Sequence, residues 1–160
     1  MTTEGSIRKF LSTIREGLRQ DMKAKDLVSS GNSSASMHIE SEAKKEQAAG
    51  QLWGKHYIQQ EITGRRPGRF PPIDRILEWI KQRGIVPDDI SERSLAFLIA
   101  RKIARRGTEI FQGKRPGLDL KGIVQAAEPE FRKDLIEGSK ARYRTSLMGA
   151  FKEAQAALVR

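Results

Sequence analysis

The chain contains no cysteine and only two histidines among its 160 residues. The absence of cysteine excludes disulfide bonds, thiolate metal sites and a cysteine nucleophile. Two histidines leave little for a zinc site or for acid–base catalysis. No apolar run reaches the roughly 18 residues of a transmembrane helix. No apolar stretch of signal-peptide length follows the N-terminus. These absences predict a protein that is made in the cytosol and has no membrane partner.

The motifs of common enzyme classes are missing as well. The sequence has no phosphate-binding loop, no nucleophile elbow, no histidine pair at helical ligand spacing and no dense carboxylate cluster. Asp88-Asp89 is the only acidic doublet, and its place just before an expected helix explains it most simply. We therefore predict that the chain is not an enzyme and carries no metal ion or cofactor.

Positive charge is abundant and unevenly distributed. The chain has 30 Lys and Arg against 20 Asp and Glu, a net charge of +10, and the segment 63–118 holds 13 basic and 6 acidic residues. Three basic clusters account for most of this excess and give the candidate contacts to a partner or to DNA: Arg65, Arg66 and Arg69; Arg101, Lys102, Arg105 and Arg106; Lys114 and Arg115. Such clusters attract phosphate backbones or acidic protein surfaces. For any single cluster, a solvated helix face or helix-end pairing is the simpler explanation.

Hydrophobic periodicity predicts an α+β fold that is predominantly helical. An N-terminal helix is expected over 6–28, followed by a loop at 29–36. Alternation predicts a strand at 36–41 that pairs with a second strand at 51–54, with 42–50 as an exposed turn between them. The result would be a small β-hairpin or sheet.

Two central helices follow a short helix at 56–62 and an irregular Gly/Pro/Arg segment at 64–72. The first is expected over 73–83, with Gly84 as its stop, and the second over 92–106, with Ser91 as its N-cap and Gly107 as its end. The second has an expected apolar stripe of Leu95, Leu98, Ile99 and Ile103 beside three alanines. A charge placed at Leu98 would then unfold the domain.

The C-terminal region predicts helices interrupted at Glu128-Pro129 and again near Gly138, with a long last helix over 139–159. That last helix has a thin apolar stripe that includes Tyr143, Leu147 and Phe151, which favours packing on a partner or on a neighbouring copy. We expect residues 1–118 to form one α+β domain and residues 119–160 to form a helical extension.

The stretch from Tyr57 to Phe111 resembles a recurring block of tailed-bacteriophage virion proteins of the neck and tail-completion type. The matching elements are Tyr57-Ile-Gln-Gln-Glu-Ile62, Thr63-Gly-Arg-Arg-Pro-Gly68, Pro71-Pro-Ile73, Ile76-Leu-Glu-Trp-Ile80, Gly84-Ile85, Leu95-Ala-Phe-Leu-Ile-Ala-Arg-Lys-Ile103 and Arg106-Gly-Thr108. The stretch covers about a third of the chain, and the order of its elements carries more weight than any single motif.

The resemblance implies a structural virion protein that forms a ring of six or twelve copies in the head–tail connector, or at the head-proximal end of the tail, after DNA packaging. It would be assembled in the host cytoplasm. Its partners would be other copies of itself and adjacent neck, portal-adaptor or tail proteins, and its basic residues could also face genomic DNA in the channel. A ring needs two different faces on each copy, for which the Arg65–Phe70 loop and the terminal helix are the candidates.

The sequence is also compatible with two other functional hypotheses. In the first, the chain is a free nucleic-acid-binding protein, with Arg101, Lys102, Arg105 and Arg106 following phosphates along one helix. Against this, aromatic residues make up only 6% of the chain, and Trp53, Tyr57, Phe70 and Trp79 are not interleaved with the basic residues. In the second, the chain is an adaptor or a toxin-like enzyme acting on nucleic acid, which would need an acid–base pair that the sequence lacks.

Overall fold

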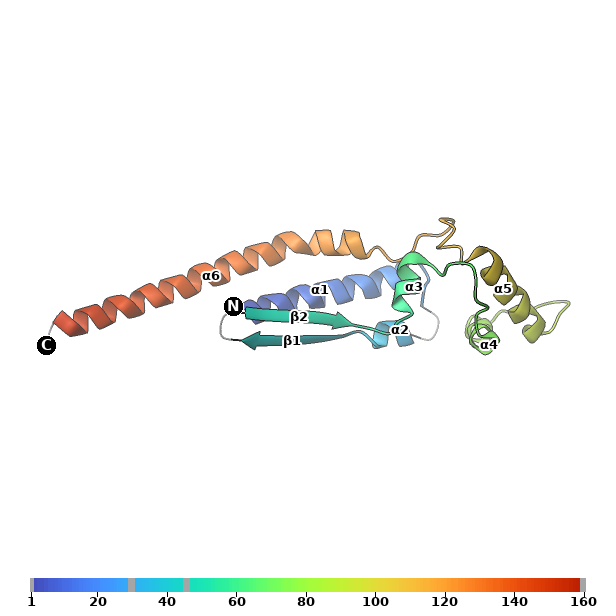
Figure 1. The fold of residues 1–160 in the computed structure, drawn as a ribbon, viewed down its shortest axis with the longest axis horizontal. Helices are drawn as coiled ribbons and strands as arrows, with labels where there is room; N and C mark the ends of the chain where they lie inside the picture. Colours follow the sequence, from blue (N-terminus) through green and yellow to red (C-terminus); the bar gives the residue numbers. More distant parts are fainter. Residues whose placement is uncertain (1, 29–30, 45–46, 159–160) are drawn as a thin grey trace.

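The computed structural model describes residues 2–28, 31–44 and 47–158, with side chains to residue 152, and shows an elongated α+β protein that is predominantly helical, as predicted (Figure 1). Its elements in chain order are α1 (Thr3–Ala24), α2 (Asn32–Ala35), β1 (His38–Lys44), β2 (Gln47–Trp53), α3 (Ile58–Thr63), α4 (Ile73–Gln82), α5 (Glu92–Arg106) and α6 (Leu120–Leu158). The predicted loop at 29–36 contains the single helical turn α2, while Ser29 and Ser30 lie outside the described residues.

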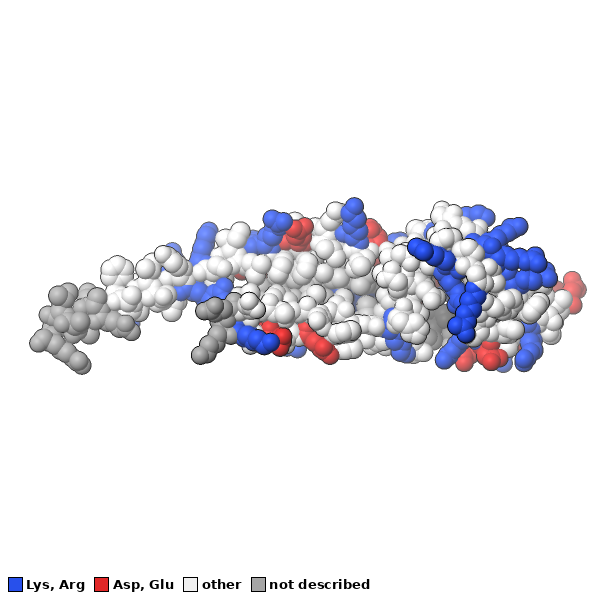
Figure 2. Space-filling view, in the orientation of Figure 1, with Lys and Arg blue, Asp and Glu red and all other residues white. Residues whose placement is uncertain are grey.

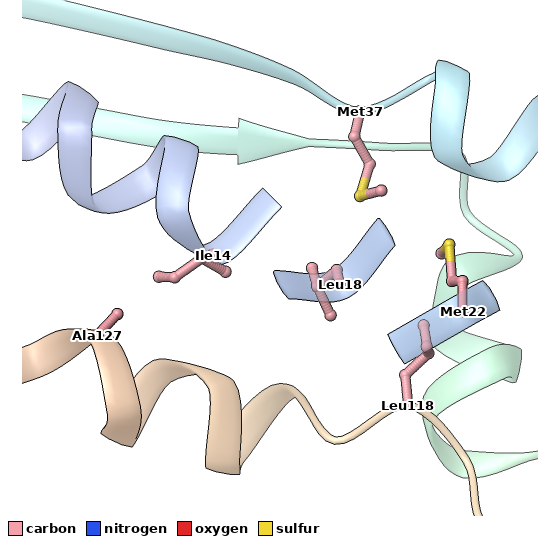
Figure 3. Packing of buried hydrophobic residues seen from close by; sticks show 6 residues of the cluster. All are labelled: Ile14, Leu18, Met22, Met37, Leu118 and Ala127. Atoms are coloured by element: carbon pink, nitrogen blue, oxygen red, sulfur yellow. The ribbon is translucent and has the colours of Figure 1, made fainter. Parts of the chain in front are cut away.

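Helix α1 is the middle layer of the N-terminal part, with the hairpin on one side and α6 on the other (Figure 1). The Thr2 side chain caps α1 by accepting a hydrogen bond from the Gly5 N–H at 3.1 Å. The buried stripe of α1 consists of Ile14, Leu18 and Met22. Figure 3 shows this stripe between Met37, which precedes the hairpin, and Ala127 and Leu118, which belong to α6 and the segment leading into it. Together these six residues form the first hydrophobic core.

The hairpin is longer than predicted, so the exposed turn expected at 42–50 is wrong. Strands β1 and β2 pair in antiparallel register from His38 opposite Trp53 to Lys44 opposite Gln47, and only Lys45 and Glu46 of the expected turn lie outside the described residues. The missed part of β2, Gln47–Gly50, has no β-branched residue to indicate a strand. Gly50 fits at this point because α1 lies close: a Cβ on Gly50 would approach Leu11 Cδ1 to 2.8 Å.

Helices α4 and α5 form a second hydrophobic core, at the other end of the molecule. Ile76 and Ile80 of α4 pack against Ala96 and Ala100 of α5. The predicted caps of α5 are confirmed: the Ser91 side chain accepts from the Ser94 N–H at 3.1 Å, and Gly107 ends the helix with φ 75°. The burial predicted for Leu98 is wrong, because its side chain is 43% exposed. The fully buried residues of α5 are the alanines, and the other members of the predicted stripe, Leu95, Ile99 and Ile103, are partly buried and pack against this core.

Helix α6 runs without interruption through Pro129 and Gly138, so the two predicted breaks are wrong. Tertiary contacts hold the helix across Pro129. The ring of Phe131 stacks on Phe10 of α1 with a 4.4 Å centroid separation. Lys9 Nζ lies 2.7 Å from a Glu130 carboxylate oxygen and 2.9 Å from one of Asp134, and these bonds raise the pKa of Lys9. Packing and ion pairs on α1 therefore override the local preference of proline.

Replacing Pro129 with alanine is expected to stabilise the protein by about 2 kcal/mol. Alanine restores the backbone N–H donor that a helix interior requires. Part of this gain is offset because proline lowers the conformational entropy of the unfolded chain. Thermal unfolding followed by far-UV circular dichroism measures this gain. An unchanged or lower Tm would mean that the helix depends on the proline at this point.

The parts of the chain that carry the two cores are joined at Asp26, the only described non-glycine residue with positive φ (51°). Arg83, which follows α4, donates to an Asp26 carboxylate oxygen at 2.5 Å and to its carbonyl at 2.6 Å. Arg115 also donates to the Asp26 carbonyl, at 2.9 Å, and to the carbonyl of Lys25. Two arginines therefore fasten the segment after α1 to the part of the chain that carries α4 and α5. The predicted boundary between residues 118 and 119 stays a prediction.

Candidate interaction surface at the basic end

Two of the predicted basic clusters, far apart in sequence, are joined by backbone hydrogen bonds. The Gly68 N–H donates to the carbonyl of Ala104 at 2.8 Å, which ties the loop after α3 to the last turn of α5. The Arg65 N–H donates to Thr108 Oγ1 at 2.9 Å, and the Thr108 N–H returns a bond to the Arg65 carbonyl at 3.0 Å. The loop at 64–70 and the C-terminal end of α5 therefore form one surface, which we call the basic end.

Glycine is required where the two segments cross. Gly107 has a left-handed φ of 75°, and a Cβ at this position would lie 2.7 Å from the carbonyl oxygen of Arg65. Gly64, on the opposite segment, is buried and has φ 74°. Side chains are disfavoured at both positions by conformation and by space. The Gly residues that flank the arginines in the sequence thus serve to bring the two clusters together.

Most of the cations of the basic end are exposed and free to meet a partner. Arg66, Arg69, Arg101, Arg105 and Arg106 are exposed, and none of them forms an ion pair with the part of the chain that the structure describes. Figure 2 shows the resulting concentration of blue at the end of the molecule that holds α4 and α5. Arginine is always charged and offers a planar set of donors to carboxylates or phosphates. The arrangement suits a polyanionic or acidic partner.

The remaining predicted cations are partly used within the chain. Half-buried Arg65 donates through Nη2 to the Arg69 carbonyl at 3.0 Å and so shapes its own loop. Lys102 lies 3.6 Å from a carboxylate oxygen of Glu109, with both side chains exposed. Lys114 is exposed and has no ion pair among the described residues, whereas Arg115 holds the backbone at Lys25 and Asp26. The structure therefore separates exposed cations from cations that organise the fold.

An aromatic pair lies within the basic end, which sequence reasoning missed. The rings of Phe70 and Phe97 are tilted with centroids 5.6 Å apart, and both side chains are exposed. Phe70 follows Arg69 directly, and Phe97 lies one helical turn before Arg101 on the same face of α5. The expectation that aromatic and basic residues are not interleaved is therefore wrong for this pair. The sequence pattern places Phe97 on neither face of α5, and its contact with Phe70 is visible only in the structure.

Glu61 of α3, just before the loop, connects α3 to the segment that leads into α6 and to α2. The Glu61 carbonyl accepts from the Leu118 N–H at 2.9 Å, and its carboxylate accepts from the Ser33 hydroxyl at 2.5 Å. The second carboxylate oxygen is buried without a hydrogen-bond partner among the described residues. Burial raises the pKa of Glu61, and the bond from Ser33 only partly opposes this.

Replacing Glu61 with glutamine is expected to raise the Tm at neutral pH. Because its pKa is raised by folding, Glu61 binds a proton more tightly in the folded chain, so stability falls as the pH rises from about 4.5 through the folded pKa. The variant lacks this penalty, and its advantage should disappear below pH 4.5. Melting curves of the wild type and the variant, from below pH 4.5 to neutral pH, provide the measurement. A Tm difference that is the same at every pH would contradict the prediction.

Within the described residues, no group of three or more His, Asp or Glu side chains is placed to hold a metal ion. None of the described helices is both long enough and apolar enough to span a membrane. Comparison with protein-family models, with curated proteins and with solved structures found no match to this chain.

Proposed function

We propose that the protein is a structural component of a tailed-bacteriophage virion, forming a ring in the head–tail connector or at the head-proximal end of the tail. The observation that carries the proposal is the separation of two unlike surfaces. The basic end lies at one end of an elongated molecule, and α6 projects from the other (Figures 1 and 2). Closed rings are built from contacts between unlike faces of identical subunits.

The chemistry of the basic end suits a junction. Its arginines can pair with carboxylates of an adjacent neck, portal-adaptor or tail protein, or with phosphates of DNA in the channel. The exposed Phe70 and Phe97 would supply the apolar centre that protein interfaces generally contain. The motifs that gave the resemblance lie in α3, α4 and α5 and in the loops between them, so the resembling block includes the whole of this surface.

Loss of the chain from a phage that encodes it tests the proposal. A nonsense mutation early in its gene is expected to yield DNA-filled heads and free tails that fail to join, and supplying the chain from a plasmid should restore infectious particles. Electron microscopy of the lysate distinguishes these products. Normal joined particles in the absence of the chain would contradict the proposal.

A second function is favoured by one observation, the aromatic pair among the arginines. Exposed rings beside cations are used to stack bases of single-stranded nucleic acid while arginines follow the phosphates. A free binding protein should bind DNA or RNA with an affinity that falls steeply with salt and should be absent from virions. Replacement of Phe70 and Phe97 by leucine would weaken such binding but would leave a purely ionic contact unchanged.

A further inference from the structure

The part of α6 that extends beyond α1 has an uncovered apolar stripe. Tyr143 is 71% exposed and Phe151 is 66% exposed, and Leu147 and Met148 between them are exposed as well. Tyr143, Leu147 and Phe151 recur every four residues along one side of the helix, and Met148 lies next to Leu147. We call these four residues the tail stripe. A stripe of large side chains on a projecting helix needs a partner to remove it from water.

Between Glu137 and Glu153, the tail stripe is accompanied by positive charge only. Residues 139–152 contain Lys140, Arg142, Arg144 and Lys152 and no acidic residue. All four are exposed, and none forms an ion pair with the described residues. Among the described residues, Arg142 donates a 3.4 Å hydrogen bond to the hydroxyl of Ser139. The surface that covers the stripe should therefore be both apolar and acidic.

The outer face of the hairpin has this character. A hollow of about 260 Å³ lies on it, lined by Glu40, Ser41, Glu42, Ala49, Gly50 and Gln51. Two carboxylates and no cation line this hollow, although Lys44 approaches Glu42 to 3.6 Å from beyond it. Behind it, Glu4 of α1 adds a third carboxylate, which accepts from Ser41 Oγ at 3.0 Å.

An exposed aromatic side chain borders the same face. Trp53 stands opposite His38 in the hairpin register, and its indole N–H donates to a Glu40 carboxylate oxygen at 2.9 Å. Tryptophan in such a position offers a large contact area with a polar group already satisfied. The hairpin face thus combines an aromatic surface, a hollow floored by Ala49 and a pair of carboxylates.

The two surfaces of one chain cannot meet each other. Helix α1 packs between α6 and the hairpin, and α6 continues away from the body as one helix (Figure 1). The outer face of the hairpin points away from α1 and therefore away from α6. Only the tail of another copy can reach it, and because the two faces differ, each copy can give one contact and receive one.

We propose that the tail stripe of one copy docks on the outer hairpin face of the next, with Arg142 and Arg144 facing Glu40 and Glu42 and the apolar side chains covering Ala49 and Trp53. Repetition of this contact joins the subunits head to tail in one direction. Closure of this assembly into a ring rests on the proposed function, but the contact itself is tested on the purified protein.

Cysteine cross-linking tests the pairing directly, since the native chain has no cysteine. Two full-length single variants, Ala49→Cys and Leu147→Cys, are mixed and oxidised. A disulfide between the two variants, identified by mass spectrometry, is expected. Gln125→Cys, on the exposed side of α6 where that helix packs on α1, is the matched control and should not cross-link to Ala49→Cys. Cross-links only between two Leu147→Cys chains would show tail-to-tail pairing and overturn the inference. The absence of any disulfide between the two variants would overturn it as well.

Charge exchange provides the second readout. Analytical ultracentrifugation measures the oligomer. It should fall to monomer in each of two double variants, Arg142→Glu/Arg144→Glu and Glu40→Lys/Glu42→Lys. The variant that combines all four substitutions should form the oligomer again. Lys121→Glu/Lys133→Glu makes the same charge change elsewhere on α6 and should leave the oligomer intact. An oligomer that survives both reversals, or a monomeric wild type, would overturn the inference. A confirmed contact in a protein that is absent from virions would refute the proposed function alone.

Discussion

Replacing Ile80 with aspartate is expected to unfold the pair of helices α4 and α5. The Ile80 side chain is fully buried against Ala96 and Ala100, in a core built from hydrophobic side chains. An unpaired carboxylate buried in such a place, together with the lost packing, costs about 4 kcal/mol or more. Far-UV circular dichroism should show the loss of helix, and limited proteolysis should cut between residues 73 and 106.

Leu98→Asp is the matched control, because it places the same carboxylate on the same pair of helices at an exposed position. We expect it to change the free energy of unfolding by no more than about 1 kcal/mol. If Leu98→Asp unfolds the protein and Ile80→Asp does not, the facing sides of α4 and α5 have been assigned the wrong way round.

Reversing the charge of Arg66, Arg69, Arg101 and Arg105 together to glutamate is expected to leave the fold intact and to block the joining of heads to tails. All four side chains are exposed without an ion pair in the described structure. Like charges facing an acidic partner cost several kcal/mol, so infectious titre should fall by about a hundredfold or more. Arg65 is left unchanged because its guanidinium holds the Arg69 carbonyl.

Replacement of the same four arginines by lysine keeps the charge and removes the planar donor pattern. A partial defect in this control would indicate bidentate contacts, and full activity would indicate attraction by charge alone. Normal titre from the glutamate variant, with unchanged circular dichroism, would exclude the basic end as the joining surface.

The elements that the sequence predicted well are those with local determinants. Helix α5 begins and ends where expected because Ser91 and Gly107 act on their own backbone neighbours. The continuity of α6 was not predictable in this way, because the ion pairs of Lys9 with Glu130 and Asp134 join residues more than a hundred positions apart. The exposure of Leu98 was not predictable for a related reason: it depends on how α5 packs against Ile76 and Ile80.

The basic end could be predicted only in parts. Its arginines were recognised as separate clusters from composition, and their flanking glycines were recognised as breaks. The Gly68–Ala104 and Arg65–Thr108 bonds that join the clusters depend on how α5 returns to the loop. No local pattern specifies that return. The same long-range geometry separates exposed Arg66 from Arg65 and Arg115, whose guanidinium groups serve the fold.

Counting this chain in purified virions tests its assignment as a connector most directly. Quantitative mass spectrometry against an isotopically labelled standard should find a fixed complement of six or twelve copies per particle, the ring sizes implied by the resemblance to neck and tail-completion proteins. Absence of the chain from mature particles that are fully infectious would contradict the assignment.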